Sequence, residues 1–223
     1  MAQADIHELP WEGRAALLKD FSGRPWWVRL VWSRRVMRRE IRTLQSLEGV
    51  AGIPRVLALA GRNAFVLERL NATRMPKIWR EAPPPPAFWI NGRRLIEQLH
   101  ARGVGHGDLR RKNILMGPGG EAYLIDFATA LRHKPRGWNA WLINALLVRY
   151  QQVDRVTWAR IKASYRSARL DEEERRWLAE EPWFLSLGRW LKKRVYRLRK
   201  PQWWRDRFRM TRDWVRGRFT PRH

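Results

Sequence analysis

Residues 106–128, HGDLRRKNILMGPGGEAYLIDFA, are the most informative stretch of this 223-residue chain. Asp108 stands in a loop rich in glycine and arginine, and Asp126 follows the second of two apolar runs that a Gly-Pro-Gly-Gly turn separates. This pattern predicts a β-hairpin that brings Asn113, at its beginning, beside Asp126, at its end. Carboxylate and amide oxygens grouped in this way suit Mg²⁺, which takes substrate phosphates as further ligands. The stretch therefore predicts a site for Mg²⁺ and phosphate; the simpler alternative is a hairpin with solvated surface aspartates.

The same residues resemble a known family. HGDLRRKN resembles the catalytic loop H-R-D-L-x-x-x-N of protein-kinase-like phosphotransferases, and Ile125–Ala128 resembles their metal-binding D-F-G motif. The separations of 5 residues from Asp108 to Asn113 and 18 residues from Asp108 to Asp126 match that pattern. Gly107, in place of arginine, resembles the branch that includes small-molecule kinases, RIO-like kinases and the bacterial lipopolysaccharide core (Kdo) kinases. The Kdo kinase and RIO-like group fits best over the whole chain.

This resemblance implies an α+β, two-lobed protein-kinase-like fold with a reduced N-lobe sheet and a helical C-lobe. It implies ATP and Mg²⁺ as cofactors. In such a site Asp108 orients and deprotonates the acceptor hydroxyl, and Arg110 contacts the transferring phosphate. Asn113 and Asp126 hold the Mg²⁺ that accompanies the nucleotide.

Two residues of the N-terminal part extend the resemblance. Residues 15–21 predict a buried strand bearing Lys19, which resembles the strand lysine that binds the α- and β-phosphates. Residues 33–47 predict an amphipathic helix with Glu40 beside its apolar stripe. Lys19 and Glu40 resemble the Lys/Glu pair of kinases, in which the carboxylate keeps a buried lysine charged. The alternatives are an edge lysine on a strand and a carboxylate solvated at the border of the stripe.

The nucleotide base is expected at the junction between the lobes. Residues 55–60 and 64–70 predict a hairpin, and Glu68 opens the segment that leads into the hinge, against which the base would lie. No glycine-rich phosphate loop precedes Lys19, since only Gly13 stands there. We therefore expect the first strand pair to be short or absent and the ATP phosphates to be less covered than in a full kinase.

The chain after Ala128 departs from protein kinases. Only residues 129–137 precede a predicted helix at 138–150, a second helix is predicted at 153–165, and an A-P-E motif is absent. So short a segment leaves little room for a peptide platform, which favours a small acceptor. Asp154 has two interpretations that the sequence leaves open: an acid at a helix N-terminus that complements the helix dipole, or a buried aspartate that holds the catalytic loop.

Charge and composition bear on location. The chain has 46 Lys/Arg and 21 Asp/Glu, a net charge of +25, and no cysteine. Disulfides are thus impossible, and neither a secretory leader nor an apolar stretch of the roughly 20 residues that span a bilayer is evident. We predict a cytoplasmic protein.

Domain organisation follows from the same patterns. We predict an N-lobe at residues 1–70, a C-lobe with the catalytic loop and metal site at 71–182, and a basic, aromatic helical tail at 183–223. The tail has the composition of a helix that lies in a membrane interface, which predicts peripheral attachment to the inner face of the cytoplasmic membrane. A core-packed helix is the alternative, and nucleic acid is a less favoured partner.

The predicted activity is transfer of the ATP γ-phosphoryl group to a hydroxyl of a sugar or lipid-linked saccharide, such as lipopolysaccharide core. Two alternatives remain at this stage. One is a RIO-like serine/threonine protein kinase, which shares the short segment after Ala128. The other is an inactive kinase-like scaffold or binding protein at the membrane, because a missing phosphate loop is also typical of inactive relatives.

Overall fold

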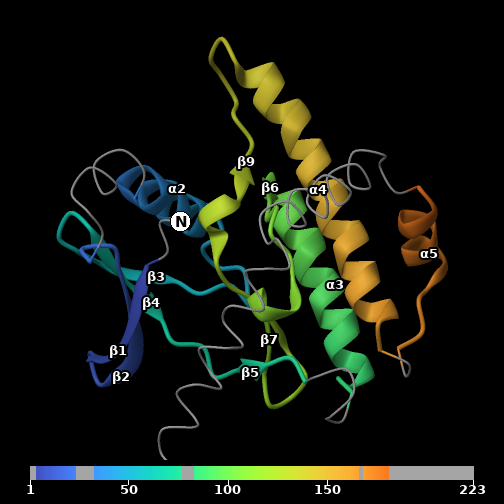
Figure 1. Cartoon of the computed structure of the whole chain (residues 1–223), viewed down its shortest axis with the longest axis horizontal. Helices are drawn as coiled ribbons and strands as arrows, with labels where there is room; N and C mark the ends of the chain where they lie inside the picture. Colours follow the sequence, from blue (N-terminus) through green and yellow to red (C-terminus); the bar gives the residue numbers. More distant parts are fainter. Residues whose placement is uncertain (1–3, 24–32, 77–82, 166–167, 181–223) are drawn as a thin grey trace, which may run out of the picture. The chain divides into compact units, whose positions relative to one another are not determined.

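The computed structural model describes residues 4–23, 33–76, 83–165 and 168–180, which belong to one compact unit ending at Glu180 (Figure 1). The predicted tail, residues 183–223, lies outside the described residues. A strand-rich N-terminal part is followed by a mainly helical C-terminal part. In chain order the elements are β1 (Asp5–Trp11), β2 (Arg14–Asp20), α2 (Arg34–Ser46), β3 (Val56–Ala60), β4 (Ala64–Glu68), β5 (Thr73–Arg74), α3 (Pro86–Ala101), β6 (Val104–Gly105), η2 (Arg111–Asn113), β7 (Ile114–Met116), β8 (Ala122–Leu124), η3 (Phe127–Thr129), β9 (Leu131–Arg132), α4 (Ala140–Ala163) and α5 (Glu172–Ala179).

Four antiparallel strands form the N-terminal sheet in the order β1-β2-β4-β3. β1 and β2 each have 7 residues and are joined by a two-residue turn at Glu12 and Gly13, whose φ angles are 48° and 75°. A turn with two positive φ angles matches the twist of the strands that it connects, so it closes a hairpin without a longer loop. The expectation of a short or absent first strand pair was therefore wrong, because hairpin formation needs no glycine-rich loop.

Helix α2 packs its predicted apolar stripe into the core of the N-terminal part. Met37, Ile41 and Leu44 are buried, while the arginines of the opposite face are mostly exposed. The predicted helix and the predicted hairpin of β3 and β4 differ from the observed bounds only at their ends. Apolar residues at helical spacing predicted the helix, and two apolar runs on either side of a turn predicted the hairpin.

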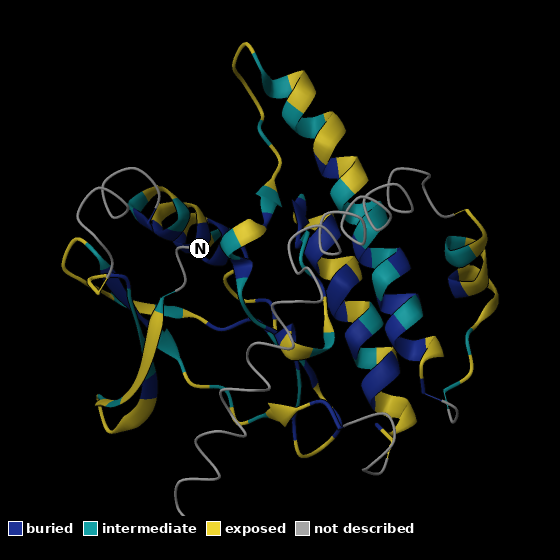
Figure 2. Cartoon of the chain, viewed as in Figure 1, coloured by how far each residue is buried: buried dark blue, intermediate teal, exposed yellow. Residues whose placement is uncertain are grey.

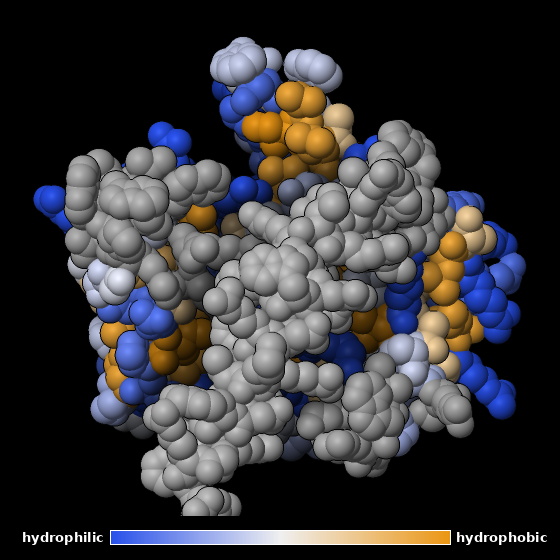
Figure 3. All heavy atoms as spheres, in the orientation of Figure 1, coloured by the Kyte–Doolittle hydropathy of each residue, from blue (hydrophilic) through white to orange (hydrophobic). Residues whose placement is uncertain are grey.

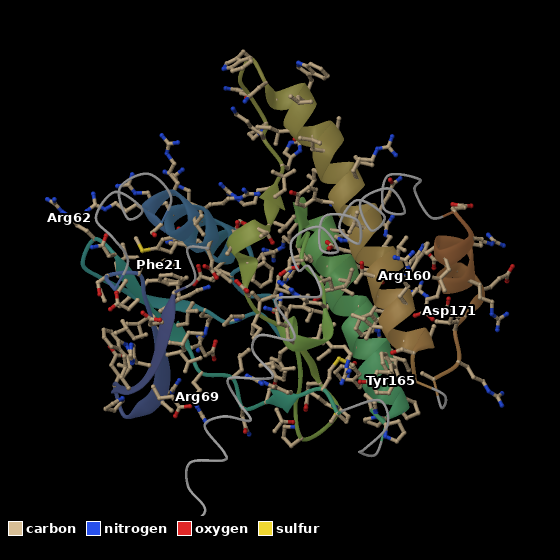
Figure 4. All side chains as sticks on the ribbon, in the orientation of Figure 1. Phe21, Arg62, Arg69, Arg160, Tyr165 and Asp171 are labelled. Atoms are coloured by element: carbon tan, nitrogen blue, oxygen red, sulfur yellow. The ribbon has the colours of Figure 1, made fainter. Side chains whose placement is uncertain are left out.

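The C-terminal part is organised around α3 and the C-terminal half of α4. Its core is an aromatic cluster with ring centroids 5.2–6.2 Å apart, made of Phe88, Trp89, Trp158 and Tyr165. Gly92 permits this packing, because a Cβ at that position would overlap the Trp158 ring. Tyr165, labelled in Figure 4, also donates its hydroxyl hydrogen to the Pro76 carbonyl oxygen at 2.6 Å, which anchors the start of the C-terminal part.

The helix α4 is one continuous element of 24 residues, whereas the sequence predicted two helices divided near residues 151–152. That division was wrong, because residues 150–153 contain neither glycine nor proline and helix propagation meets no barrier there. What changes along α4 is burial: its C-terminal half is largely buried and its N-terminal half is exposed (Figure 2). Neither α4 nor any other helix of the described residues combines the length and apolarity needed to cross a membrane.

Candidate active site

Lys19 on β2 and Glu40 on α2 form a buried ion pair. The Lys19 Nζ lies 2.7 Å and 2.8 Å from the two carboxylate oxygens of Glu40. Burial raises the pKa of the Glu40 carboxyl above its ordinary value, and the Lys19 ammonium opposes that effect. The pair thus holds the lysine side chain in one position on the inner side of the N-terminal sheet.

Asp126 joins this pair from the C-terminal part. Its Oδ1 lies 3.6 Å from the Lys19 Nζ, and its backbone has the left-handed angles φ 69° and ψ 68°. Such angles are uncommon for residues other than glycine, and these outliers cluster at functional sites. Phe127, which is fully buried, follows directly and its ring contacts His106 with centroids 4.8 Å apart. The Lys19 ammonium therefore lies between the carboxylates of Glu40 and Asp126.

Asn113 hydrogen-bonds to Asp108 and to the residue that precedes Asp126. Its side-chain amide donates to the Asp108 carbonyl oxygen at 2.9 Å and to Asp108 Oδ2 at 3.2 Å. The backbone carbonyl oxygen of Asn113 accepts the backbone N–H of Ile125 at 3.0 Å, at the end of the β7–β8 hairpin. The predicted hairpin is thus present between Asp108 and Asp126.

Arg110 contacts Asp108 directly. Its guanidinium forms an ion pair with Asp108 Oδ2, and both side chains are partly exposed. The carboxylate of Asp108 is therefore shared between Arg110 and Asn113. A substrate hydroxyl that approaches Asp108 must share it with Arg110 or displace that side chain.

Asp154 holds the backbone of the catalytic loop. It is fully buried within α4, and it accepts the backbone N–H groups of His106 at 2.7 Å and Gly107 at 2.9 Å. The His100 Nε2 lies 3.2 Å from the same carboxylate. Of the two interpretations of Asp154, the structure supports the loop-holding aspartate, because the residue lies inside the helix and not at its N-terminus. His100 was not identified from the sequence, where a single histidine in a helical pattern carries no signal.

Glycine is required at position 107 by both backbone and packing. Its φ is +72°, and a Cβ there would overlap the ring of Tyr150 on α4. The glycine that replaces the arginine of the motif thus leaves room for the Tyr150 ring against the loop beside Asp108. Sequence reasoning missed Tyr150, whose position depends on the continuity of α4.

Arg39 links α2 to the segment that follows Asp126. Its guanidinium donates to the carbonyl oxygens of Ala130 at 2.7 Å and Thr129 at 3.0 Å. The helix that carries Glu40 and the segment that carries Asp126 are therefore tied together independently of Lys19. Nothing distinguished Arg39 from the neighbouring arginines in the sequence.

Glu68 has a different environment from the other predicted site residues. Within the described part of the chain, its carboxylate accepts hydrogen bonds from the Arg55 backbone N–H at 3.2 Å and the Arg55 Nε at 3.1 Å. Its own backbone N–H donates to the Arg55 carbonyl oxygen at 2.9 Å. The structure thus does not bring the Glu68 side chain together with Lys19 and Asp126.

The donor set fits the cofactors that the resemblance implies. The Asn113 amide nitrogen is engaged by Asp108, which leaves the amide oxygen as a ligand atom, and the Asp126 carboxylate is partly exposed. Two oxygen ligands from the protein suit Mg²⁺, which binds substrate phosphates and water in its other positions. Lys19 beside Asp126 and Arg110 beside Asp108 add positive charge, as a polyphosphate requires.

The fold is that of the protein kinases. The structure is similar to that of the Rio2 kinase in an ADP/Mg²⁺-phosphoaspartate complex from Chaetomium thermophilum, with a TM-score of 0.50, 20% sequence identity, and coverage of 79% of this chain and 58% of that chain. At this identity the likeness concerns the fold alone. It confirms the predicted α+β, kinase-like architecture.

The family is narrower than the fold. The model of the lipopolysaccharide kinase (Kdo/WaaP) family matches residues 33–165, which include Asp108, Asn113, Asp126 and Asp154 but not Lys19. The chain belongs to this family, as the catalytic-loop motif predicted.

Two relatives are named 3-deoxy-D-manno-octulosonic acid kinase. The one from Xanthomonas campestris pv. campestris (strain B100) is 37% identical over 82 residues, 34% of this chain and 33% of the relative. The one from Xylella fastidiosa (strain M12) is 33% identical over 91 residues, 39% of this chain and 36% of the relative. The matched segments thus span about a third of each relative's length.

Proposed function

We propose that the protein transfers the γ-phosphoryl group of ATP to a hydroxyl of a lipopolysaccharide core sugar, with Mg²⁺ as the metal. The observation that carries this proposal is the connected arrangement in which Lys19 contacts both Glu40 and Asp126, while Asn113 contacts Asp108. Catalysis of phosphoryl transfer consists chiefly of positioning and charge neutralisation, and this arrangement supplies groups for both.

Each residue of the arrangement has a proposed role. Lys19, held by Glu40, binds the α- and β-phosphates, and Asn113 with Asp126 holds Mg²⁺, which neutralises charge on the phosphates when it is bound. Asp108 accepts the proton of the acceptor hydroxyl while the hydroxyl oxygen bonds to the γ-phosphorus. The bond between the γ-phosphorus and the oxygen that bridges it to the β-phosphate breaks, and ADP leaves. Arg110 contacts the transferring group once the acceptor displaces it from Asp108. For Glu68 we propose only that it lies beside the nucleotide base, in the segment that leads into the hinge.

The segment after Asp126 supports a small acceptor over a protein loop. β9 pairs with β6, and the His133 N–H donates to the Gly103 carbonyl oxygen at 2.7 Å, so this segment folds back on the C-terminal part. Residues 129–134 of the segment 129–137 thus form hydrogen bonds within the chain. The names of the two relatives favour a sugar of the lipopolysaccharide core for the same position.

Location and domain organisation are part of the proposal. We place the protein on the cytoplasmic side of the inner membrane, with an N-lobe at residues 1–70, a C-lobe at 71–182 and a tail at 183–223. Residues 189–223 contain 14 Lys/Arg and 2 Asp/Glu together with several tryptophans, a composition that suits an anionic membrane surface. Nucleic acid remains the competing polyanion for the tail.

The test is an acceptor assay with isotopically labelled ATP. Purified protein is incubated with separate lipopolysaccharide-precursor, free-saccharide and protein fractions, and label is expected in the first. Asp108→Asn and Asp126→Asn should each abolish transfer while the unfolding transition stays cooperative. Label that appears only in protein would favour a RIO-like protein kinase, and absence of both Mg·ATP binding and transfer would favour an inactive scaffold.

A further inference from the structure

The N-terminal end of α4 carries an exposed apolar face that the phosphotransfer site does not use. This part of the helix extends beyond the neighbouring described elements, and its apolar side chains gather on one surface (Figures 1 and 3). The exposed members form what we call the α4 apolar face, which consists of Trp138 in the turn before the helix and, on the helix, Trp141, Leu142, Ala145, Leu146 and Val148. Trp138 is 90% exposed and Trp141 is 73% exposed. Large aromatic side chains left in water on one surface mark an interaction site.

The charge around this face has one sign. Between Asp126 and Asp154 the chain has no acidic residue, whereas its basic residues there are Arg132, Lys134, Arg136 and Arg149. A second basic surface lies at β9, which precedes α4 in the chain: a depression of about 290 Å³ is lined there by five arginines of α2 and β9, Arg35, Arg38, Arg39, Arg42 and Arg132. The surroundings of the α4 apolar face therefore suit an anionic partner.

We propose that the α4 apolar face inserts into the interfacial region of an anionic lipid bilayer, with the surrounding Lys and Arg side chains on lipid phosphates. Tryptophan is favoured at headgroup depth, leucine and valine are favoured below it, and cations are favoured at the anionic surface. This combination of side chains on one helix end is what a bilayer selects. The inference rests on the proposed function only for the identity of the acceptor, and membrane contact itself is independent of catalysis.

Other occupants fit the chemistry less well. A second copy of the chain would bring two basic segments together, each in a protein of net charge +25. The chain's own residues 189–223 carry net charge of the same sign, since 14 basic residues there face 2 acidic ones. Nucleic acid would stack on Trp138 and Trp141 but would leave Leu142, Leu146 and Val148 in water, whereas a bilayer buries them.

The face is mechanically joined to the catalytic loop. β9, which leads toward α4, pairs with β6 just before His106, and Tyr150 of α4 packs against Gly107 beside Asp108. A bilayer that holds the end of α4 would thus hold Asp108 at a fixed distance from the lipid surface. An acceptor sugar carried on a lipid would meet the catalytic aspartate in that geometry.

The absence of cysteine permits a site-specific test on the full chain. A polarity-sensitive fluorophore is attached to Leu142→Cys and, as the matched control, to Ile90→Cys on α3; the two native side chains are 46% and 53% exposed. Vesicles of phosphatidylglycerol with phosphatidylethanolamine should shift the emission of the label at 142 to shorter wavelength, and nitroxide-labelled lipid should quench it. The label at 90 should not respond, and pure phosphatidylcholine vesicles should have little effect on either.

Vesicle-bound protein whose label at 142 responds no more than the label at 90 would overturn the proposal, because another segment such as the tail would then make the contact. Absence of vesicle binding, or the same response to rising protein concentration or to RNA without vesicles, would also overturn it.

As a second measurement, Trp138→Ser/Trp141→Ser should lower vesicle partitioning by about tenfold or more and leave phosphotransfer to a soluble saccharide unchanged. Partitioning equal to that of the parent would contradict the assignment. If the parent transfers no phosphate but the label at 142 still inserts, the proposed function fails and the membrane contact stands.

Discussion

The carboxylate of Asp154 accepts the backbone N–H of His106 at 2.7 Å, across 48 residues of sequence. The second oxygen of the same carboxylate accepts the N–H of Gly107 at 2.9 Å. A fully buried carboxyl side chain in α4 thereby orients the N–H groups of the two residues that precede Asp108. The position of Asp108, the proposed catalytic aspartate, thus depends on a buried residue of another element.

Asp154→Asn should destabilise the protein and lower its activity. The amide keeps one acceptor oxygen but turns an NH₂ group toward a backbone N–H, so one buried donor loses its partner, at a cost of about 2–4 kcal/mol. Urea unfolding would measure the loss. Glu172→Gln is the control, because its exposed i,i+4 pair with Arg176 should contribute less than about 1 kcal/mol. Equal effects of the two substitutions would contradict a special role for Asp154.

The sequence predicted two pairs within the candidate site, because the members of each pair lie close together along the chain. One hairpin separates Asp108 from Asp126, so spacing alone constrained their geometry, and turn residues identified the hairpin. Lys19 and Glu40 could be paired because a strand followed by an amphipathic helix leaves few ways to bury both side chains. The observed pair has that geometry.

Longer-range relationships could not be read in the same way. Asp154 had two interpretations because assigning a helix start near residue 153 placed it at a helix N-terminus, and only the continuous α4 places it in the interior. Tyr150 reaches Gly107 and His100 reaches Asp154 through packing of α4 on α3 and β6, which no local pattern encodes. The first hairpin was underestimated because the missing glycine-rich loop was taken to shorten its strands, whereas the two-residue turn at Glu12 and Gly13 closes it.

Gly107→Ala should destabilise the protein more than Gly61→Ala. Both glycines have φ of +72°, but a Cβ at position 61 meets open space and a Cβ at position 107 overlaps Tyr150. The shared left-handed backbone should cost about 1–2 kcal/mol in either variant, and the difference between them measures the steric overlap. Thermal and urea unfolding would give both values. Adding Tyr150→Ala to Gly107→Ala should recover the extra loss, and no recovery would show that Tyr150 is not its source.

Glu40→Gln should reveal a stability contribution that decreases as pH rises. Burial raises the pKa of Glu40 above its ordinary value of 4.5, although Lys19 opposes the shift. A carboxyl with a raised pKa binds its proton more tightly in the folded state, so its contribution is fully present below the unfolded pKa and is lost as pH rises through the folded pKa. The difference in unfolding free energy between parent and Glu40→Gln should therefore shrink with increasing pH above 4.5.

Asp20→Asn provides the control of opposite sign for that measurement. Hydrogen bonds from the Ser22 side chain and backbone lower the Asp20 pKa below 3.8. Its contribution should be present above that value and be lost as pH falls through the folded pKa. A difference for Glu40→Gln that instead grows with pH would mean that attraction to Lys19 outweighs burial.

Lys162 and Glu174 should show strong energetic coupling, because their ion pair is buried between α4 and α5. The Lys162 Nζ lies 2.6 Å from Glu174 Oε2, and Glu174 is fully buried. Removing one partner leaves an uncompensated charge, so Lys162→Met and Glu174→Gln should each cost about 3–5 kcal/mol. Glutamine can retain the capping box that Glu174 forms with Asp171, so the comparison isolates the charge.

The double variant should lose much less unfolding free energy than the sum of the two single losses, with a coupling energy of about 2–3 kcal/mol in urea unfolding. Additive losses would show that the two charges do not stabilise each other.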